Sequence, residues 1–303
     1  MITLRHHLVS LVAVFLALAV GVVLGGGPLS DLGRVTKADA ARADKSSDRQ
    51  VEAAAAVATF TDQFATETAA GTLANGLAGQ TVVVVSLPGA DPATTEQLAG
   101  LVKTGGGTVV GRYAVQPALV DPTEKSLVDT LGSQLATSLK GVAVPADATT
   151  YVRMGRLLGL GVATTTAAGA AVDANATAVV ESLKGADLMT TTSTTKRGSL
   201  VLVVLGDEPA NPDTGTDVIV GGLVTGLSQV TNGAVVAGTT ASGESGLLSQ
   251  LRADETASAT VSMTDSVQTG AGQVTAVLAL AAAKNDEVGS FGASGADGPV
   301  PVR

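Results

Sequence analysis

The sequence predicts an α/β protein in which an N-terminal transmembrane helix and a helical stalk precede a doubly wound domain built on a mostly parallel sheet. Three observations support this fold class: an apolar run near the N-terminus, a charged and then alanine-rich segment after it, and β-branched runs that alternate with helical segments from Gln80 onward. Such alternation is typical of a parallel sheet with helices on both faces. The predicted segments are residues 1–28 (signal anchor), 29–76 (stalk), 77–284 (α/β domain, with a helix-rich section at 142–196) and 285–303 (disordered tail).

The predicted anchor is the apolar run from Leu8 to Leu24, which reads LVSLVAVFLALAVGVVL. At a rise of 1.5 Å per residue, about 20 apolar residues cross a hydrocarbon core of roughly 30 Å. Because Arg5 precedes the run, the positive-inside rule predicts a single-pass membrane protein with a cytoplasmic N-terminus and an extracytoplasmic bulk. A cleaved signal peptide is the alternative, since Ala17-Leu18-Ala19 resembles a cleavage site. Cleavage there would fall inside the apolar run, which favours an uncleaved anchor.

The stalk is predicted to be helical and to carry one apolar stripe. Val57, Phe60 and Phe64 follow one another at i, i+3 and i+7, which places them on one face of a helix, as in a short coiled coil. This stripe either packs on the domain behind it or forms a seam with a partner, and barely two heptads are visible. We predict it as an interaction surface for another protein or a second copy.

The domain begins with a strand at Thr81–Val85, where a continuous β-branched run is typical of a strand buried on both faces. A helix at Thr94–Lys103 and a strand starting at Thr108–Val110 complete a β-α-β unit. Asp121-Pro122 then predicts a helix start, with the acid at the cap and proline at the first position, and the helix runs through about Leu139.

The alternation resumes after the helix-rich middle section, in which the predicted helices are Arg153–Val162 and Asp173–Lys184. Leu200–Leu205 is the strongest predicted strand of the chain. The remaining predicted elements are a helix at Asp217–Gln229, a strand at Ala234–Ala237, a helix at Ser245–Arg252, a strand at Ala259–Met263 and a closing helix at Gly272–Lys284. The tail from Asn285 is rich in glycine, serine and proline, and we expect it to be disordered.

Composition and motifs exclude several classes of protein. A net charge of −9 argues against nucleic-acid binding, because phosphates would repel this surface. The chain has no cysteine, and its two histidines are His6 and His7, so the outer domain cannot carry a Ser-His-Asp or Cys-His set. No phosphate-binding G-x-x-x-x-G-K-[ST] motif occurs, and the glycines at 155, 159 and 161 lack the dinucleotide-binding spacing. We therefore predict no enzyme activity, no cofactor, and no catalytic or metal-binding residues.

Acidic residues follow the strongest predicted strand. Asp207, Glu208 and Asp213 lie in the loop after Leu205, and open α/β sheets bind ligands in the crevice beyond the carboxyl ends of their strands. The loops at 86–91 and 239–244 would lie along the same edge. These residues form a weak candidate crevice for a small ligand or a divalent cation, and turn or cap roles are the alternative.

Both ends of the chain resemble a known family. The start, MITLRHHLVSLVAVFLALAVGVVLGGG, and the ending, QVTAVLALAAAKNDEVGSFGASG, are similar to the actinobacterial MctB-like copper transport family, and the similarity runs from end to end. Its most specific parts are Leu4-Arg5-His6-His7, Gly25-Gly26-Gly27 and Gly289-Ser290-Phe291-Gly292. The resemblance implies an envelope protein, in the outer envelope for some members, that is linked to copper efflux or pore formation. In the SteB-like branch it implies a role in cell separation.

The residues of this chain give little support to copper binding or to a pore. Copper(I) prefers thiolate and thioether ligands and copper(II) prefers imidazole, whereas this chain has no cysteine and four methionines far apart in sequence. His6 and His7 would lie at the cytoplasmic edge of the anchor, where a role as interfacial residues beside Arg5 is favoured. Since no second 18-residue apolar run follows Leu24, a pore made by one copy is not expected.

We therefore predict a single-span cell-envelope protein whose extracytoplasmic α/β domain acts through protein contacts, in the envelope or in cell separation. Its expected partners are the membrane, through the N-terminal helix, and a protein bound through the stalk. A copper efflux or homeostasis component, or a pore subunit, is the alternative that the resemblance implies. A ligand-binding or hydrolase domain that uses the acidic crevice is a third hypothesis.

Overall fold

The computed structural model describes residues 37–141, 144, 145, 147–192, 194–206 and 215–301. The predicted anchor therefore lies outside the described residues. In the part of the chain that is described, no helix is both long enough and apolar enough to cross a membrane. The chain divides into two compact units, residues 1–60 and 61–303, and the second unit contains the predicted α/β fold.

A seven-stranded sheet forms the centre of the second unit, in the order β4-β2-β1-β6-β7-β8-β9. Neighbouring strands are parallel throughout, except for the antiparallel pair β2–β4. The sheet is thus mostly parallel, as predicted, and its topology switches direction between β1 and β6. The strands are β1 (Thr81–Ser86), β2 (Thr108–Val115), β4 (Met189–Thr191), β6 (Leu200–Val204), β7 (Ala234–Ala237), β8 (Ser262–Thr264) and β9 (Ser290–Phe291). A separate pair joins β3 (Ala170–Ala171) to β5 (Lys196–Arg197).

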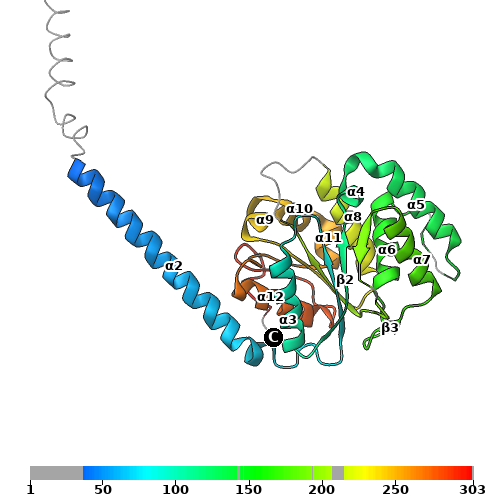
Figure 1. Cartoon of the computed structure of the whole chain (residues 1–303), viewed down its shortest axis with the longest axis horizontal. Coiled ribbons are helices and arrows are strands. Elements are labelled where there is room, and N and C mark those ends of the chain that lie inside the picture. The colour runs from blue at the N-terminus through cyan, green and yellow to red at the C-terminus, as the bar shows by residue number, and fades with distance from the viewer. Residues whose placement is uncertain (1–36, 142–143, 146, 193, 207–214, 302–303) are drawn as a thin grey trace, which may run out of the picture. The chain divides into compact units, whose positions relative to one another are not determined.

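Helices cover both faces of this sheet (Figure 1). Alternate residues of β1 point to opposite faces: Val82 and Val84 pack in one core cluster, and Val83 and Val85 in the other. The first cluster is covered by α3 (Pro92–Thr104), α12 (Gly270–Ala283) and the last turns of α2 (Lys37–Leu73). The second is covered by α4 (Pro117–Val120), α5 (Lys125–Ser138), α6 (Thr150–Val162), α7 (Ala174–Gly185), α8 (Thr216–Ser228), α10 (Leu247–Ala253) and α11 (Glu255–Thr260).

The last turns of α2 belong to the second unit. Ala69 and Leu73 are buried in the core cluster beneath α3 and α12. The Asp62 carboxylate accepts a hydrogen bond from the Gly270 N–H at the start of α12, and at the other end of that helix the Lys284 ammonium donates to the Gly76 carbonyl. A soluble fragment of the domain should therefore begin at residue 61, because a cut at the end of the predicted stalk would remove part of the core.

Glycines let α6 and α8 approach to backbone contact. A Cβ on Gly155 would lie 2.0 Å from the Leu223 carbonyl oxygen, and a Cβ on Gly226 would lie 2.0 Å from the Val152 carbonyl oxygen. No side chain fits at either position. The glycine spacing in α6, which does not match a dinucleotide-binding motif, therefore serves helix packing.

Three sequence predictions need correction. The single helix expected from Asp121 to Leu139 is divided into a 3₁₀ turn (Pro122–Glu124) and α5. The strand expected at Ala259–Met263 begins only at Ser262, because the Asp254 carboxylate accepts hydrogen bonds from two backbone N–H groups and caps α11 over residues 255–260. The section at 142–196 holds α6 and α7 as predicted but also β3 and β4, which are too short to show a hydrophobic period.

The predicted disordered tail differs most from the structure. Residues after α12 cross the sheet edge and form β9, which pairs in parallel with β8. The missed feature is a β-α-β unit whose last strand has only two residues. The glycine-rich composition around this strand gives it a low β propensity, so the sequence did not predict it. The strand forms because of its contacts with residues that are distant in the chain.

Candidate functional site

The structure describes only part of the predicted crevice. Asp207, Glu208 and Asp213 lie outside the described residues, so the crevice remains a prediction. The loop after β1 touches the end of β6, since a Cβ on Gly206 would lie 2.0 Å from the Pro88 carbonyl oxygen. In that same loop the Asp91 carboxylate accepts hydrogen bonds from two N–H groups at the start of α3, which is a cap role.

The loop at 239–244 follows β7 and contacts the residues after β8, at the same carboxyl edge of the parallel strands as the loop after β1. It includes most of α9 (Thr240–Ser245), which the Thr239 side chain caps. Its Thr240 hydroxyl lies 3.0 Å from the hydroxyl of Ser266, the residue after Asp265. Among the described residues, the cluster of charged and hydroxyl side chains at this edge is therefore centred on the end of β8.

A fully buried carboxylate, Asp265, stands at the carboxyl end of β8. It accepts hydrogen bonds from residues on three separate segments, and each bond is 3.0 Å or shorter. The donors are Arg252 Nη1 (3.0 Å), Ser266 Oγ (2.7 Å), Ala293 N (2.6 Å), Ser294 N (3.0 Å) and Ser294 Oγ (2.6 Å). Hydrogen bonds to an ionised acceptor are stronger than neutral ones. This network therefore holds α10 and the C-terminal residues firmly against the end of β8.

Arg252 forms the cationic half of the network. Its side chain is 12% exposed, against 0% for Asp265. Besides the ion pair, its Nη1 donates to Ser294 Oγ at 2.8 Å and its Nη2 donates to the Phe291 carbonyl at 2.8 Å. The guanidinium therefore contacts both the carboxylate and the end of β9, so the pair holds the C-terminal tract, residues 289–298, against β8.

The environment keeps Asp265 ionised at neutral pH. Burial alone would raise the pKa of this carboxyl group, but the hydrogen bonds from Ser294, Ser266 and the N–H of Ala293 outweigh it and hold the pKa below its ordinary value. The Arg252–Asp265 pair is therefore charged on both sides, with its charges compensated inside the protein.

Glycines make the C-terminal tract possible. Gly292 has a φ of +113°, and a Cβ there would lie 2.4 Å from Asp265 Oδ1. A Cβ on Gly295 would lie 2.5 Å from the Ser290 carbonyl oxygen. The motif Gly289-Ser290-Phe291-Gly292, quoted above for its resemblance to a family, thus has a physical role: its last residue must be glycine for the chain to pass over Asp265.

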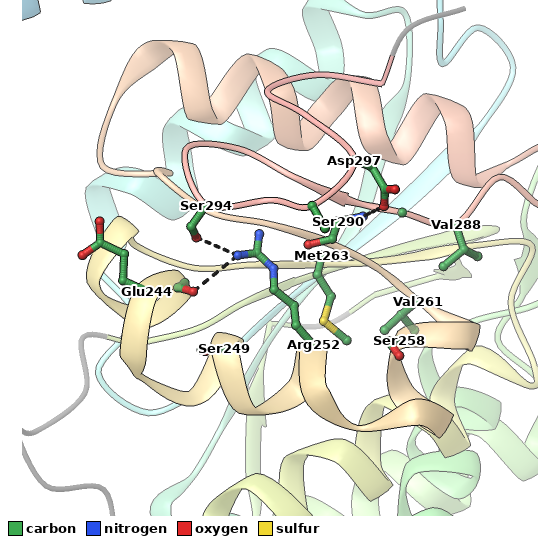
Figure 2. Close-up of a pocket in the computed structure, with 13 residues that line it drawn as sticks. Glu244, Ser249, Arg252, Ser258, Val261, Met263, Val288, Ser290, Ser294 and Asp297 are labelled. Carbon is green, nitrogen blue, oxygen red and sulfur yellow. Dashed lines mark hydrogen bonds between the residues drawn. The ribbon is translucent and has the colours of Figure 1, made fainter.

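A cavity of about 580 Å³ lies beside this network. Figure 2 shows Arg252 reaching from α10 toward Ser294, with Ser290 and Asp297 on the opposite side. Val261, Met263 and Val288 contribute apolar surface, and the acidic groups in the lining are Glu244 and Asp297. Asp265 already compensates the charge of Arg252, so the remaining lining consists of apolar residues, four serines and two acidic residues, and it contains no histidine or cysteine.

Sequence reasoning missed this network. Arg252, Asp265 and Ser294 come from an α-helix, a strand end and the tract expected to be disordered, and no spacing rule connects them. The one available signal was the pair of glycines in Gly289-Ser290-Phe291-Gly292, because a glycine in a strand often marks a site where another backbone approaches closely.

The predicted stripe lies on α2 as expected from its spacing. Val57, Phe60 and Phe64 are 64%, 68% and 58% exposed. Val51 on the same helix is also well exposed and was not part of the prediction. The structure thus places the stripe on a helix surface, and its role as a contact site stays a prediction.

Comparison with known families explains the end-to-end resemblance. The family model described as "Copper transport outer membrane protein, MctB" matches residues 1–302. The chain belongs to this family. Its relatives include the "Copper transporter MctB" of Mycobacterium tuberculosis (strain ATCC 25618 / H37Rv), which is 28% identical over 301 residues, and that of Mycobacterium leprae (strain TN), which is 30% identical over 302 residues. Each alignment covers 92% of this chain and 92% of the relative.

Because relatives of this chain are named copper transporters, we looked for residues in it that could bind copper. His6 and His7 lie outside the described residues, and the chain has no cysteine. Within the described ranges, no three histidine, cysteine, aspartate or glutamate side chains gather to hold a metal ion. Met154, Met189 and Met263 are buried in the core. The described part of this family member therefore offers no soft-ligand set that fits copper.

Proposed function

We propose that this chain is a single-span protein of the cell envelope, whose α/β domain lies outside the cytoplasm, has no enzymatic activity and acts through contacts with other proteins. Family membership supports the envelope location, because the family is described as an outer membrane one. The hydropathy of the N-terminal segment supports the anchor. A protein that acts through contacts must also present a surface on which a partner can pack.

The distribution of exposed apolar side chains carries this proposal. Among the described residues, the well-exposed large apolar side chains are Val51, Val57, Phe60, Phe64, Leu127, Val218 and Val288. The first four lie on a single helix, α2, so exposed apolar side chains are concentrated there. Burying a side chain of this size stabilises an assembly by about 1.5–3 kcal/mol relative to leaving it in water, so a partner surface along the stripe would gain substantial free energy.

A double substitution tests the stripe. Phe60→Asp together with Phe64→Asp in the full-length chain should abolish a crosslink to a neighbouring protein or copy in intact cells, while the melting temperature stays nearly unchanged. Val218→Asp is the matched control, because Val218 is similarly exposed, at 67%, but belongs to a different helix, α8. A fall of several degrees in the melting temperature of the double variant would assign the stripe to folding and contradict the proposal.

The anchor has its own test. If residues 8–24 stay uncleaved, the mature protein should begin at or near Met1 and remain in the membrane pellet after a high-salt wash. A mature N-terminus at Val20 would show that the segment is a cleaved signal peptide.

A role in copper homeostasis is the second candidate, and the names of the relatives favour it. Deletion of the gene, with copper tolerance and cell morphology measured side by side, separates the two candidates. Complementation with His6→Ala and His7→Ala then tests the two imidazoles of the chain. In a chelator competition, residues 61–303 should bind no copper(I) with sub-micromolar affinity, and stoichiometric binding would restore the copper-site hypothesis.

A further inference from the structure

The outer edge of β9 would be open if the chain ended there. Strand β9 pairs with β8 so that Met263 N–H donates to the Gly289 carbonyl and Asp265 N–H donates to the Phe291 carbonyl. Because alternate residues of a strand bond to the same neighbour, the N–H and C=O of Ser290 point away from β8. They are the groups to which an additional strand would bind.

Asp297 occupies both of these groups. The Ser290 N–H donates to Asp297 Oδ2 at 2.8 Å, and the Asp297 N–H donates to the Ser290 carbonyl at 2.9 Å. Figure 2 shows Asp297 beside Ser290, with the first of these bonds dashed. The tract therefore makes, with one residue, the two hydrogen bonds that a neighbouring strand would make.

We propose that Asp297 is an edge guard, which blocks the addition of a strand from a second copy of this chain at β9. Unpaired strand edges are templates for association, and natural proteins often protect them with a charged side chain. The need for protection is local: the cavity beside β9 has apolar lining at Val261 and Val288, and Val288 is among the exposed large apolar residues of the described part. An incoming strand would find backbone partners and apolar surface together.

The buried ion pair positions the guard. Asp265 and Arg252 hold Phe291 and Ser294, and the chain then turns back so that Gly292 N–H donates to the Gly298 carbonyl at 3.1 Å. Gly298 has a φ of +101°, which allows this return. A strand that displaced Asp297 would have to bury its carboxylate or push it out into solvent. Burying an unpaired charge costs free energy, so the negative charge also opposes strand addition.

The proposal concerns a different surface from the stripe on α2, and the test keeps the two apart. All variants are made in the full-length chain carrying Phe60→Asp and Phe64→Asp, in detergent, so that association through α2 is absent. Asp297→Ala removes the carboxylate acceptor, and a chain that ends at Ala296 removes both hydrogen bonds. Glu287→Ala is the control, because it removes an exposed carboxylate close to β9 without touching Ser290.

Light scattering after size exclusion, over a range of protein concentrations, gives the mass of each variant. Both edge variants should form dimers or larger species that the Glu287→Ala control and the background do not form. The Ser290 amide should exchange its hydrogen about tenfold faster in dilute samples, as expected for the loss of one charge-assisted hydrogen bond. Masses equal to that of the control in both edge variants, whatever the exchange rate, would overturn the proposal.

Discussion

The two edges of the sheet are closed by different physical means. At the β4 edge, Leu188 and Met189 are buried in the core cluster, and Gln116 N–H donates to the Leu188 carbonyl at 3.0 Å. At the β9 edge, a buried carboxylate and guanidinium hold a glycine-rich tract whose own residues are partly exposed. One edge is thus stabilised mainly by apolar burial and the other by compensated charge, so substitutions should affect the two edges through different mechanisms.

Two ion pairs of the sheet region differ in how exposed they are. Arg252 and Asp265 are 12% and 0% exposed, whereas Arg112 of β2 and Glu96 of α3 form a pair that is 43% and 63% exposed. Removing one partner of a buried pair leaves the other charge uncompensated in the protein interior. When one partner of an exposed pair is removed, water compensates the charge that remains. The same chemical contact should therefore matter very differently in the two places.

The largest effect is expected for Asp265→Ala. It leaves the Arg252 guanidinium without its compensating charge and the Ser294 N–H without its carboxylate acceptor. Breaking such a buried pair costs about 3–5 kcal/mol of unfolding free energy. For a unit of this size, the melting temperature should fall by roughly 10 °C. Thermal and urea unfolding measure both quantities. A loss below about 1 kcal/mol would show that the β9 edge does not depend on this network.

Met189→Ala tests the other edge and should cost about 2–5 kcal/mol, because it removes a buried side chain and leaves a cavity. The urea midpoint should fall while the slope of the transition stays the same. Leu205→Ala, at the end of β6, serves as a control for burial away from any edge. If Met189→Ala is neutral while the control is destabilised, apolar burial does not hold β4.

The pH dependence should separate the edges again. Since the folded-state pKa of Asp265 lies below the ordinary value of 3.8, the unfolded chain binds this proton more readily. The stabilisation from the carboxylate is then fully present above about pH 5 and is lost as the pH falls through the folded-state pKa. The difference in stability between the wild type and Asp265→Asn should shrink in acid, whereas the difference for Met189→Ala should not. Parallel pH profiles for both variants would contradict this assignment.

The smallest effect is expected for Glu96→Gln, which removes the exposed ion pair with Arg112. Exposed pairs contribute about 0–1 kcal/mol, so the melting temperature should change by no more than a few degrees. Added salt should reduce even this difference. A loss as large as that of Asp265→Ala would remove the distinction between buried and exposed pairs in this protein.

The predictable part of the fold is the part with a strong hydrophobic period. The runs Thr81–Val85 and Leu200–Leu205 indicate strands because β-branched and aliphatic residues without polar interruption suit a strand buried on both faces, and β1 and β6 lie there. The run at Ala234–Ala237 likewise matches β7. Elements of two or three residues, such as β4 and β9, are too short to carry a period.

The candidate site was less predictable than the fold. The rule that ligands bind beyond the carboxyl ends of strands directed attention to Asp207, Glu208 and Asp213, after the most apolar strand. Those three residues lie outside the described part of the chain, and the polar cluster that the structure does describe follows β8, a strand of three residues. Asp265 had no special standing in the sequence, because an aspartate after a short strand is more often a turn residue than a buried acceptor.

Composition and local periodicity were enough to predict the alternation of strands and helices and the lack of cysteine chemistry. Which polar residues meet depends on the packing of segments that are far apart in the chain. Arg252, Asp265 and Ser294 come together because α10, β8 and the C-terminal tract converge at one end of the sheet. The ionised state of Asp265 depends on burial and on donors from those distant segments, and neither is a property of the residues next to it in the chain.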